Sequence, residues 1–289
     1  MATAMEKLMS AVNKTKSAGF KDPHEGQYWR AEQDKAGNAF CVIRFLPGKT
    51  DDHVPFVKTY SHGFKNSSGR WFIENCPTTI DEKCPVCEGN GPLWNSGNDK
   101  DKEIVRERKR KVAYLSNILV ISDPKHPENE GKVFLFKYGQ KIFDKVVGAL
   151  TPEFEDEKPM NPFDIKVGAN FKLKIRKVEG YANYDKSEFD NVSAVEDSVQ
   201  VLKQMHDIDV FLTAAEFKTY DALKTKFDLI VGNNGQTSAP SEDQEFIEKQ
   251  AAKSEKKKEP AKAKAKTEPA EPSGEDDDLA YFARLANEE

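Results

Sequence analysis

Residues 62–87 read HGFKNSSGRWFIENCPTTIDEKCPVC and hold three of the four cysteines of the 289-residue chain. Cys84 and Cys87 form a Cys-Pro-Val-Cys pair, and Cys76 lies eight residues before Cys84. His62 precedes Cys76 across a strand-like run. One imidazole and three thiolates can close a tetrahedron around Zn²⁺ and leave no ligand position open for a reacting water. The stretch therefore predicts one structural zinc ion that staples a small lobe, with the ligands His62, Cys76, Cys84 and Cys87.

Two other interpretations of these cysteines carry chemistry. A Cys-x-x-Cys pair alone also fits a redox motif, and zinc deaminases combine one histidine with a Pro-Cys-x-x-Cys run. A deaminase carries a glutamate two residues after the histidine, where this chain has Phe64, and here Cys76 would fill the position of the reactive water. We therefore expect no enzymatic activity. Cys41 stands alone in an apolar run, and we expect it to be buried in a strand without a ligand role.

Strand-like segments surround this stretch. Runs rich in aliphatic and aromatic residues predict strands at Phe40–Leu46, Val54–Tyr60, Arg70–Glu74, Val112–Ser122, Lys132–Tyr138 and Phe171–Val178. In the last run, apolar residues from Phe171 to Ile175 alternate with basic residues from Lys172 to Arg176, which predicts a buried face and a cationic outer face. Many short strands with long insertions and few helices predict a mainly β fold with α (α+β), built on a small β-barrel of the OB type.

The core is expected to span residues 21–232, with the zinc subdomain inserted at about 60–110. Near its end, Thr213 and Glu216 have capping-box spacing ahead of an apolar-periodic segment that Gly232 closes. This pattern predicts a final helix before the composition changes.

The two ends of the chain differ from this core. Residues 1–20 place apolar residues from Met5 to Val12 at helical spacing, which predicts a short amphipathic helix that rests on the core or on another protomer. Residues 233–270 are rich in Ser, Pro, Ala, Lys and Glu and bury too little to offset the entropy of ordering, so we expect a disordered linker. The acidic tail at 271–289 fits a short helix that docks into a partner's groove. The partner-binding residues expected there are Asp276, Asp277, Asp278, Leu279, Tyr281 and Phe282.

Charge is unevenly distributed along a chain whose formal net charge is -5. Between Lys100 and Lys111 seven Lys or Arg stand against three acids, whereas Glu271 to Glu289 holds seven acids and Arg284 alone. Such asymmetry is typical of a nucleic-acid-binding surface combined with an interaction tail. A mean hydropathy of -0.73 and the lack of any apolar run of roughly 20 residues favour a soluble, intracellular protein with no membrane partner.

Basic residues stand beside aromatic ones in four places, a mixture that holds single-stranded nucleic acid. The run from Arg106 to Lys111 leads into the strand of Tyr114, although an isolated run of this kind is more simply a solvated charged loop. For Phe136, core packing is at least as good an interpretation as base stacking. The other neighbourhoods are Lys65 and Arg70 near Trp71, Lys137 beside Phe136 and Tyr138, and Arg176 and Lys177 before Tyr181 and Tyr184.

The chain resembles the gene 32 family, the single-stranded DNA-binding proteins of T-even-like bacteriophages. The resemblance runs from about Gly26 to Phe189 in matching order, which chance would not produce. It is carried by the segments Val42–Pro47 (VIRFLP), His62–Lys65 (HGFK), Trp71–Glu74 (WFIE), Cys84–Cys87 (CPVC), Asn117–Val120 (NILV), Pro127–Phe134 (PENEGKVF) and Asn183–Asp185 (NYD).

This resemblance implies a protein that coats single-stranded DNA cooperatively and without sequence specificity in viral replication, recombination and repair. It implies an OB-fold core with a structural zinc ion, self-association along DNA through the N-terminal segment, and recruitment of phage replication and recombination proteins through the acidic tail. The place of action would be the cytoplasm of the infected bacterial host. The implied base-facing aromatics are Trp71, Trp94, Tyr114, Phe136, Tyr181 and Tyr184. The implied phosphate contacts are Arg44, Lys109, Arg110, Lys111 and Lys137.

Two departures from the family pattern affect these expectations. The family's basic triplet is followed by two hydroxyl residues, whereas Val112 and Ala113 follow Lys109-Arg110-Lys111 here. The second copy of that triplet, near the N-terminus, is reduced to Lys7, Lys14 and Lys16. Cooperativity is therefore expected to be weaker or to rest on apolar contacts. An alternative from another class is a zinc-stabilised interaction scaffold that binds nucleic acid only incidentally.

Overall fold

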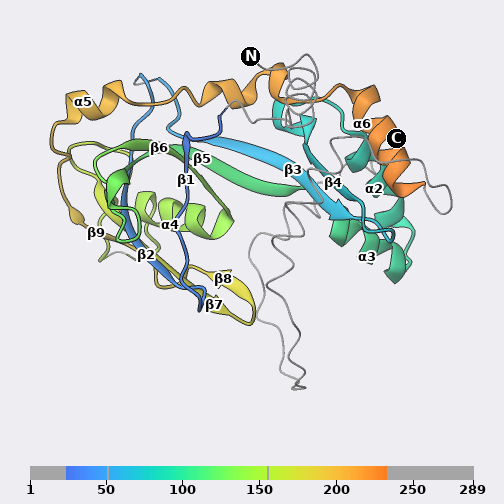
Figure 1. Cartoon of the computed structure of the whole chain (residues 1–289), viewed down its shortest axis with the longest axis horizontal. Coiled ribbons are helices and arrows are strands. Elements are labelled where there is room, and N and C mark those ends of the chain that lie inside the picture. Colours follow the sequence, from blue (N-terminus) through green and yellow to red (C-terminus); the bar gives the residue numbers. More distant parts are fainter. Residues whose placement is uncertain (1–23, 51, 155, 233–289) are drawn as a thin grey trace, which may run out of the picture.

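The computed structural model describes residues 24–50, 52–154 and 156–232 of the chain. Its fold is mixed α+β and is dominated by a nine-stranded sheet. Figure 1 shows two parts: a body in which most strands gather, and a smaller helical part at the far end of two long strands. We call them the sheet body and the metal lobe. The predicted fold class is confirmed at this level.

The strands are β1 (Tyr28–Trp29), β2 (Ala39–Phe45), β3 (Val57–Lys65), β4 (Trp71–Asn75), β5 (Lys111–Ser122), β6 (Val133–Tyr138), β7 (Ala169–Val178), β8 (Tyr181–Asn183) and β9 (Glu188–Val192). The helices are α2 (Pro85–Asn95), α3 (Asp99–Arg108), α4 (Gln140–Leu150), α5 (Ser198–Lys203) and α6 (Tyr220–Val231). Short 3-10 turns are η1 (Pro77–Ile80), η2 (Pro127–Asn129), η3 (Asp209–Leu212) and η4 (Ala214–Glu216).

The strand pairings do not close a barrel within the part of the chain that the structure describes. The order is β1-β6-β5-β2-β7-β8, with β3 joined to β5, β4 to β3 and β9 to β7. All the pairings are antiparallel except that between β1 and β6. Because β1 and β8 stand at opposite ends of this path, the sheet is not a closed barrel, and the predicted small β-barrel is not observed in that form. The strand-forming runs were identified, but alternation within a strand carries no information about whether the end strands meet.

Two long strands connect the sheet body to the metal lobe (Figure 1). The first residues of β5 pair with β3, and its last residues pair with β2, while β6 runs along its other edge. Strand β3 begins at Val57 rather than at the predicted Val54, and it continues to Lys65. Pro55 offers no N–H to a sheet ladder, which favours the later start. The longer strand places His62 inside the lobe.

The sheet body is packed around aromatic rings. Phe45 is fully buried, and its ring centroid lies 5.5 Å from that of Tyr138 and 5.8 Å from that of Phe171. As predicted, the apolar face of β7 is buried. Its basic outer face is neutralised rather than open, because Lys172 pairs with Asp190 at 2.8 Å and Lys174 pairs with a carboxylate of the same strand, β9. Helix α4 covers this core with buried Ile142 and Val146.

The last helix, α6, begins later than the capping-box pattern predicts. Thr219 is its N-cap, and the Thr219 hydroxyl accepts a hydrogen bond from the backbone N–H of Ala222 at 3.4 Å. Thr213 instead precedes the short turn η4 as its N-cap, and Glu216 is the last residue of that turn. The apolar stripe of α6 is buried against the metal lobe through Leu223, Phe227 and Ile230.

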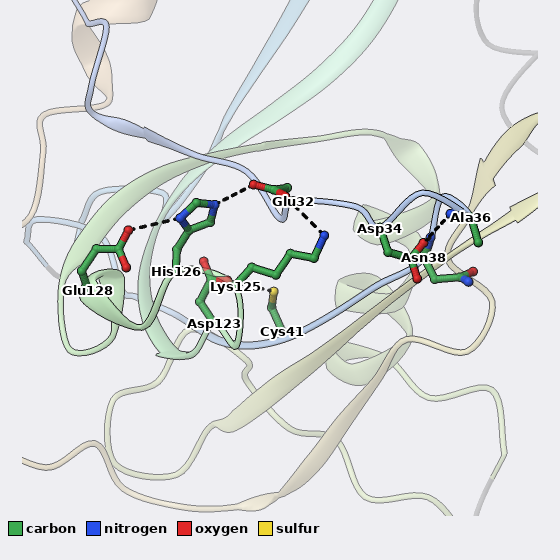
Figure 2. Close-up of polar contacts among 9 residues, drawn as sticks. All are labelled: Glu32, Asp34, Ala36, Asn38, Cys41, Asp123, Lys125, His126 and Glu128. Atoms are coloured by element: carbon green, nitrogen blue, oxygen red, sulfur yellow. Dashed lines mark hydrogen bonds and ion pairs between the residues drawn. The ribbon is translucent and has the colours of Figure 1, made fainter. Parts of the chain in front are cut away.

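A polar network fastens the segment after β1 to the turn after β5 (Figure 2). His126 lies between two carboxylates, with its Nε2 2.9 Å from Glu32 and its Nδ1 3.1 Å from Glu128. Lys125 also contacts Glu32 at 3.3 Å. The hydrogen bonds that His126 donates to the carboxylates of Glu32 and Glu128 raise the pKa of His126 above its ordinary value.

Beneath this network lies the buried carboxylate of Asp123. It accepts a hydrogen bond from the indole N–H of Trp29 at 2.9 Å. Cys41 is buried, as predicted, and its Sγ lies 3.7 Å from Oδ1 of Asp123 (Figure 2). Burial, with the nearby Asp123 carboxylate, raises the pKa of this thiol to about 12.

Several expectations concern parts of the chain outside the described residues, namely the N-terminal helix, the linker and the acidic tail with Asp276, Asp277, Asp278, Leu279, Tyr281 and Phe282. Within residues 24–50, 52–154 and 156–232, no helix has the length and apolar character needed to cross a membrane.

Candidate metal centre and nucleic-acid interface

The structure brings the four predicted metal ligands together in the metal lobe. Their donor atoms all lie within 4.8 Å of one another, and all four residues are buried. Nε2 of His62 is 3.4 Å from Sγ of Cys84 and 3.5 Å from Sγ of Cys87. Sγ of Cys76 is 3.7 Å from Sγ of Cys87. One imidazole and three thiols at this spacing can hold one metal ion, and the donor set matches a structural zinc site.

The local structure orients three of the four candidate ligands and favours their metal-binding form. Cys84 is the N-cap of α2, Pro85 occupies the first turn, and Cys87 follows within that turn. The N-terminal end of a helix favours thiolates there. Nδ1 of His62 lies 2.9 Å from the carbonyl of Arg108, which only accepts hydrogen bonds. Nδ1 therefore carries the proton, and the lone pair of Nε2 faces the sulfurs.

The thiols of the metal centre interact so strongly that they titrate as a group. Hydrogen bonds from Cys84 and Cys87 hold the pKa of Cys76 far below its ordinary value. A thiolate in the lobe interior requires a compensating positive charge, because burying an unpaired ion is costly. The chemistry of the donor set thus fits a bound cation.

A cation–aromatic cluster lies next to the metal centre, where β3 leaves the sheet body. The guanidinium carbon of Arg110 is 4.0 Å from the ring centroid of Tyr60, and Nζ of Lys58 is 5.4 Å from it. Arg110 is buried, and its Nη1 donates to Oγ1 of Thr78 at 3.0 Å. The sequence indicated Arg110 but missed Lys58 and Tyr60. Lys58 and Tyr60 stand two positions apart, so they share one face of a strand, and this pairing of a basic with an aromatic residue could have identified them from the sequence.

The opposite face of the β3–β4 hairpin carries a second group of predicted residues. Trp71 pairs across the ladder with Lys65, whose Nζ lies 5.6 Å from the indole ring. Lys111 is exposed, and its Nζ donates to the carbonyl of Gly63 at 3.1 Å. Because neighbouring strand residues face opposite sides, Lys111 diverges from the Tyr60 face on which the Arg110 guanidinium lies. The basic triplet is therefore split between two surfaces.

Two further predicted residues of the lobe are half-buried. Trp94, in α2, packs against the apolar cluster of the lobe. Lys109 is the C-cap of α3, and its backbone N–H donates to the carbonyl of Val105.

Three residues predicted to contact DNA lie inside the sheet body. Arg44 has no exposed surface, and its Nη2 donates to the carbonyls of Asp164 at 2.7 Å and Ser193 at 2.9 Å. The ring of Tyr114 is stacked on that of Phe143 at 3.8 Å, and burial raises its pKa. Phe136 is also buried in this aromatic core.

The remaining predicted residues of the described chain lie on the surface of the sheet body. Lys137 is exposed on β6. Tyr181 begins β8 and is 79% exposed, the largest exposure of the predicted aromatics. Tyr184 follows β8 and is half-buried against the core. Only some of the predicted aromatics thus have a ring face open to a ligand.

Comparisons with known proteins identify the family of this chain. A family model described as "gp32 DNA binding protein like" matches residues 37–231, which include all four candidate metal ligands. The "Single-stranded DNA-binding protein" of Enterobacteria phage T2 is 41% identical over 243 residues, covering 80% of this chain and 77% of that protein. The protein of the same name from Enterobacteria phage T4 is 40% identical over 235 residues, covering 78% of this chain and 75% of that protein. The chain belongs to the gp32 DNA binding protein like family.

Proposed function

We propose that this protein binds single-stranded DNA without sequence specificity and has no catalytic role. The observation that carries the proposal is the cation–aromatic cluster of Arg110, Lys58 and Tyr60 on the strands that join the two parts of the molecule. Cations neutralise the phosphate backbone, and aromatic rings stack on bases of any sequence. The phage T2 and T4 relatives are named as single-stranded DNA-binding proteins, which supports the same ligand.

The proposed interface draws on both parts of the molecule. From the metal lobe and the joining strands we propose contacts by Trp71, Trp94, Lys109 and Lys111, with the buried Arg110 supplying positive charge behind the phosphate. Those from the sheet body are Lys137, Tyr181 and Tyr184. Arg44, Tyr114 and Phe136 are buried, so in this proposal they shape the supporting strands and do not stack on bases or bind phosphate in this conformation.

The metal ion is proposed to be zinc with a purely structural role. Four protein ligands fill a tetrahedral site, so no position is left for a substrate. His62 and the three cysteines would anchor the start of α2 and the turn from Pro77 to Ile80, and this turn hydrogen-bonds to Arg110 and Tyr60. The sheet body is proposed to be a member of the OB class, as the family resemblance implies.

The wider role follows the family. We propose cooperative coating and protection of single strands in viral DNA replication, recombination and repair, within the cytoplasm of the infected bacterial host. Self-association along DNA would use residues 1–20. The acidic tail at 271–289 would recruit replication and recombination proteins.

Tryptophan fluorescence tests the binding proposal directly. Trp71 and Trp94 are half-buried, whereas Trp29 is buried, so a bound strand should quench the first two. The full chain is titrated with oligothymidylate at two salt concentrations. Quenching that weakens steeply with salt is the expected result. No response at low salt would overturn the proposal and favour the interaction scaffold.

A further inference from the structure

We propose that Lys58 contacts a backbone phosphate of the bound strand and that Tyr60 positions this cation. Arg110, stacked on the same ring, would supply a fixed positive charge behind the phosphate. The inference rests on the proposed function and adds two residues, Lys58 and Tyr60, that neither the sequence pattern nor the family comparison indicated.

The loop that carries the metal ligands fixes the backbone of Tyr60. The backbone N–H of Tyr60 donates to Oγ1 of Thr79 at 2.9 Å, and its carbonyl accepts from the backbone N–H of Cys76 at 2.8 Å. The half-buried ring packs against the apolar cluster of the metal lobe. Tyr60 is therefore a rigid platform before any ligand arrives.

Two cations converge on this platform. The Arg110 guanidinium is held on the ring by the hydrogen bond to Thr78, whose Oγ1 also lies 3.1 Å from Sγ of Cys76. Lys58 is exposed, and its ammonium group approaches the same ring. Two positive groups beside one ring raise the local positive potential, which attracts an anionic ligand. A cation already ordered by an aromatic ring also loses less side-chain entropy on binding.

The same face carries another cation–aromatic pair toward the metal lobe. The guanidinium carbon of Arg108 lies 5.7 Å from the ring centroid of Phe64 and 5.9 Å from that of Phe227. Phe64 lies four positions after Tyr60 on β3, and because side chains alternate along a strand, the two residues share a strand face. Phe64 and Phe227 are buried in the core of the metal lobe, so Arg108 adds positive charge beside the cluster but no further ring for a bound strand.

The salt dependence of binding separates a phosphate contact from a structural effect. Each phosphate contact to a single strand contributes about 0.7 to the slope of log K against log salt. Lys58→Gln and Tyr60→Ala should each reduce the slope of oligothymidylate binding by about 0.7, while Tyr60→Phe keeps the platform and the slope. Lys224→Gln is the matched control, because Lys224 is paired with Asp228 within α6 and should leave the slope unchanged.

The outcomes are distinct from those of the general proposal. If the wild-type chain does not bind oligothymidylate, the proposed function and this inference both fail. If the wild-type chain binds with a steep salt slope and Lys58→Gln keeps that slope, the inference alone is overturned. Equal slope losses for Tyr60→Phe and Tyr60→Ala would overturn the positioning role. Should Tyr60→Ala fail to fold, Lys58→Gln still tests the phosphate contact, and loss of slope in Tyr60→Phe would still overturn the role of the ring as a platform.

Discussion

The sheet body buries sixteen residues in its main apolar cluster, whereas the metal lobe buries ten, three of which are cysteines of the metal centre. The rings of Phe45, Tyr138 and Phe171 fill the body with apolar surface. In the lobe, side chains from β3, β4, α2, α3 and α6 meet around four polar ligands. The sheet body is thus stabilised by the burial of apolar side chains, whereas the metal lobe depends on metal coordination as well.

The largest expected effect is loss of the metal ligands. Cys87→Ser should abolish stoichiometric zinc binding, and in zinc-finger peptides such binding is worth about 10–16 kcal/mol of apparent folding free energy. Amide hydrogen exchange should show lost protection in α2 and α6 while β2 and β7 remain protected. Cys41→Ser is the matched control, because Cys41 is buried outside the cluster and should keep the metal. Loss of protection in the sheet body together with the metal lobe would contradict the claim that only the lobe depends on metal coordination.

A second prediction concerns the sheet body. Phe45→Ala removes a fully buried ring and should cost about 3–5 kcal/mol in the free energy of unfolding. Chemical denaturation measures the cost, and zinc content measured alongside should stay at the wild-type value. Loss of zinc in this variant would show that the lobe does not fold independently of the body.

Binding provides a third, smaller effect. Tyr181 is 79% exposed and Phe154 is 66% exposed, so removal of either ring should leave the fold unchanged. Tyr181→Ala should weaken oligothymidylate binding by about 1–3 kcal/mol, the value of one stacked base, because we place Tyr181 in the interface. Phe154→Ala, the control, should bind as the wild type does. Equal affinities for the two variants would restrict the interface to the metal lobe and the joining strands.

The smallest expected effect is a pH dependence confined to the sheet body. The folded-state pKa of His126 is raised, chiefly by its hydrogen bonds to Glu32 and Glu128, with Lys125 and Asp123 as the other nearby charges. Stability from protonated His126 is therefore fully present below its unfolded pKa of about 6.5 and is lost as pH rises through the folded pKa.

His126→Gln tests this dependence. Its melting temperature should fall below that of the wild type at about pH 5.5 and approach it at alkaline pH. A constant difference across this range would show that the contact is structural and does not depend on proton binding. The metal lobe should show no corresponding change in hydrogen exchange in either protein.

The sequence by itself determined six of the nine strands of the described residues, the α+β class and the four residues of the candidate metal centre. The alternation of apolar and basic residues identified β7. One histidine and three cysteines within a short stretch supply the four ligands that a tetrahedral metal ion needs. Both signals are local, since they depend on spacing along a short stretch. The position of the final helix was less determined, because Thr213 and Thr219 both offer a capping hydroxyl and tertiary packing selected Thr219.

Only the tertiary structure decided which basic and aromatic residues are accessible. Arg44 and Tyr114 fit a DNA-contact pattern in sequence, yet both side chains are buried in the sheet body. Arg110 and Lys111 are neighbours in the chain but point to opposite faces of the joining strands. Lys58 and Arg110 are distant in sequence and meet on the ring of Tyr60. Accessibility and convergence depend on strand pairing between distant segments, which residue spacing alone does not specify.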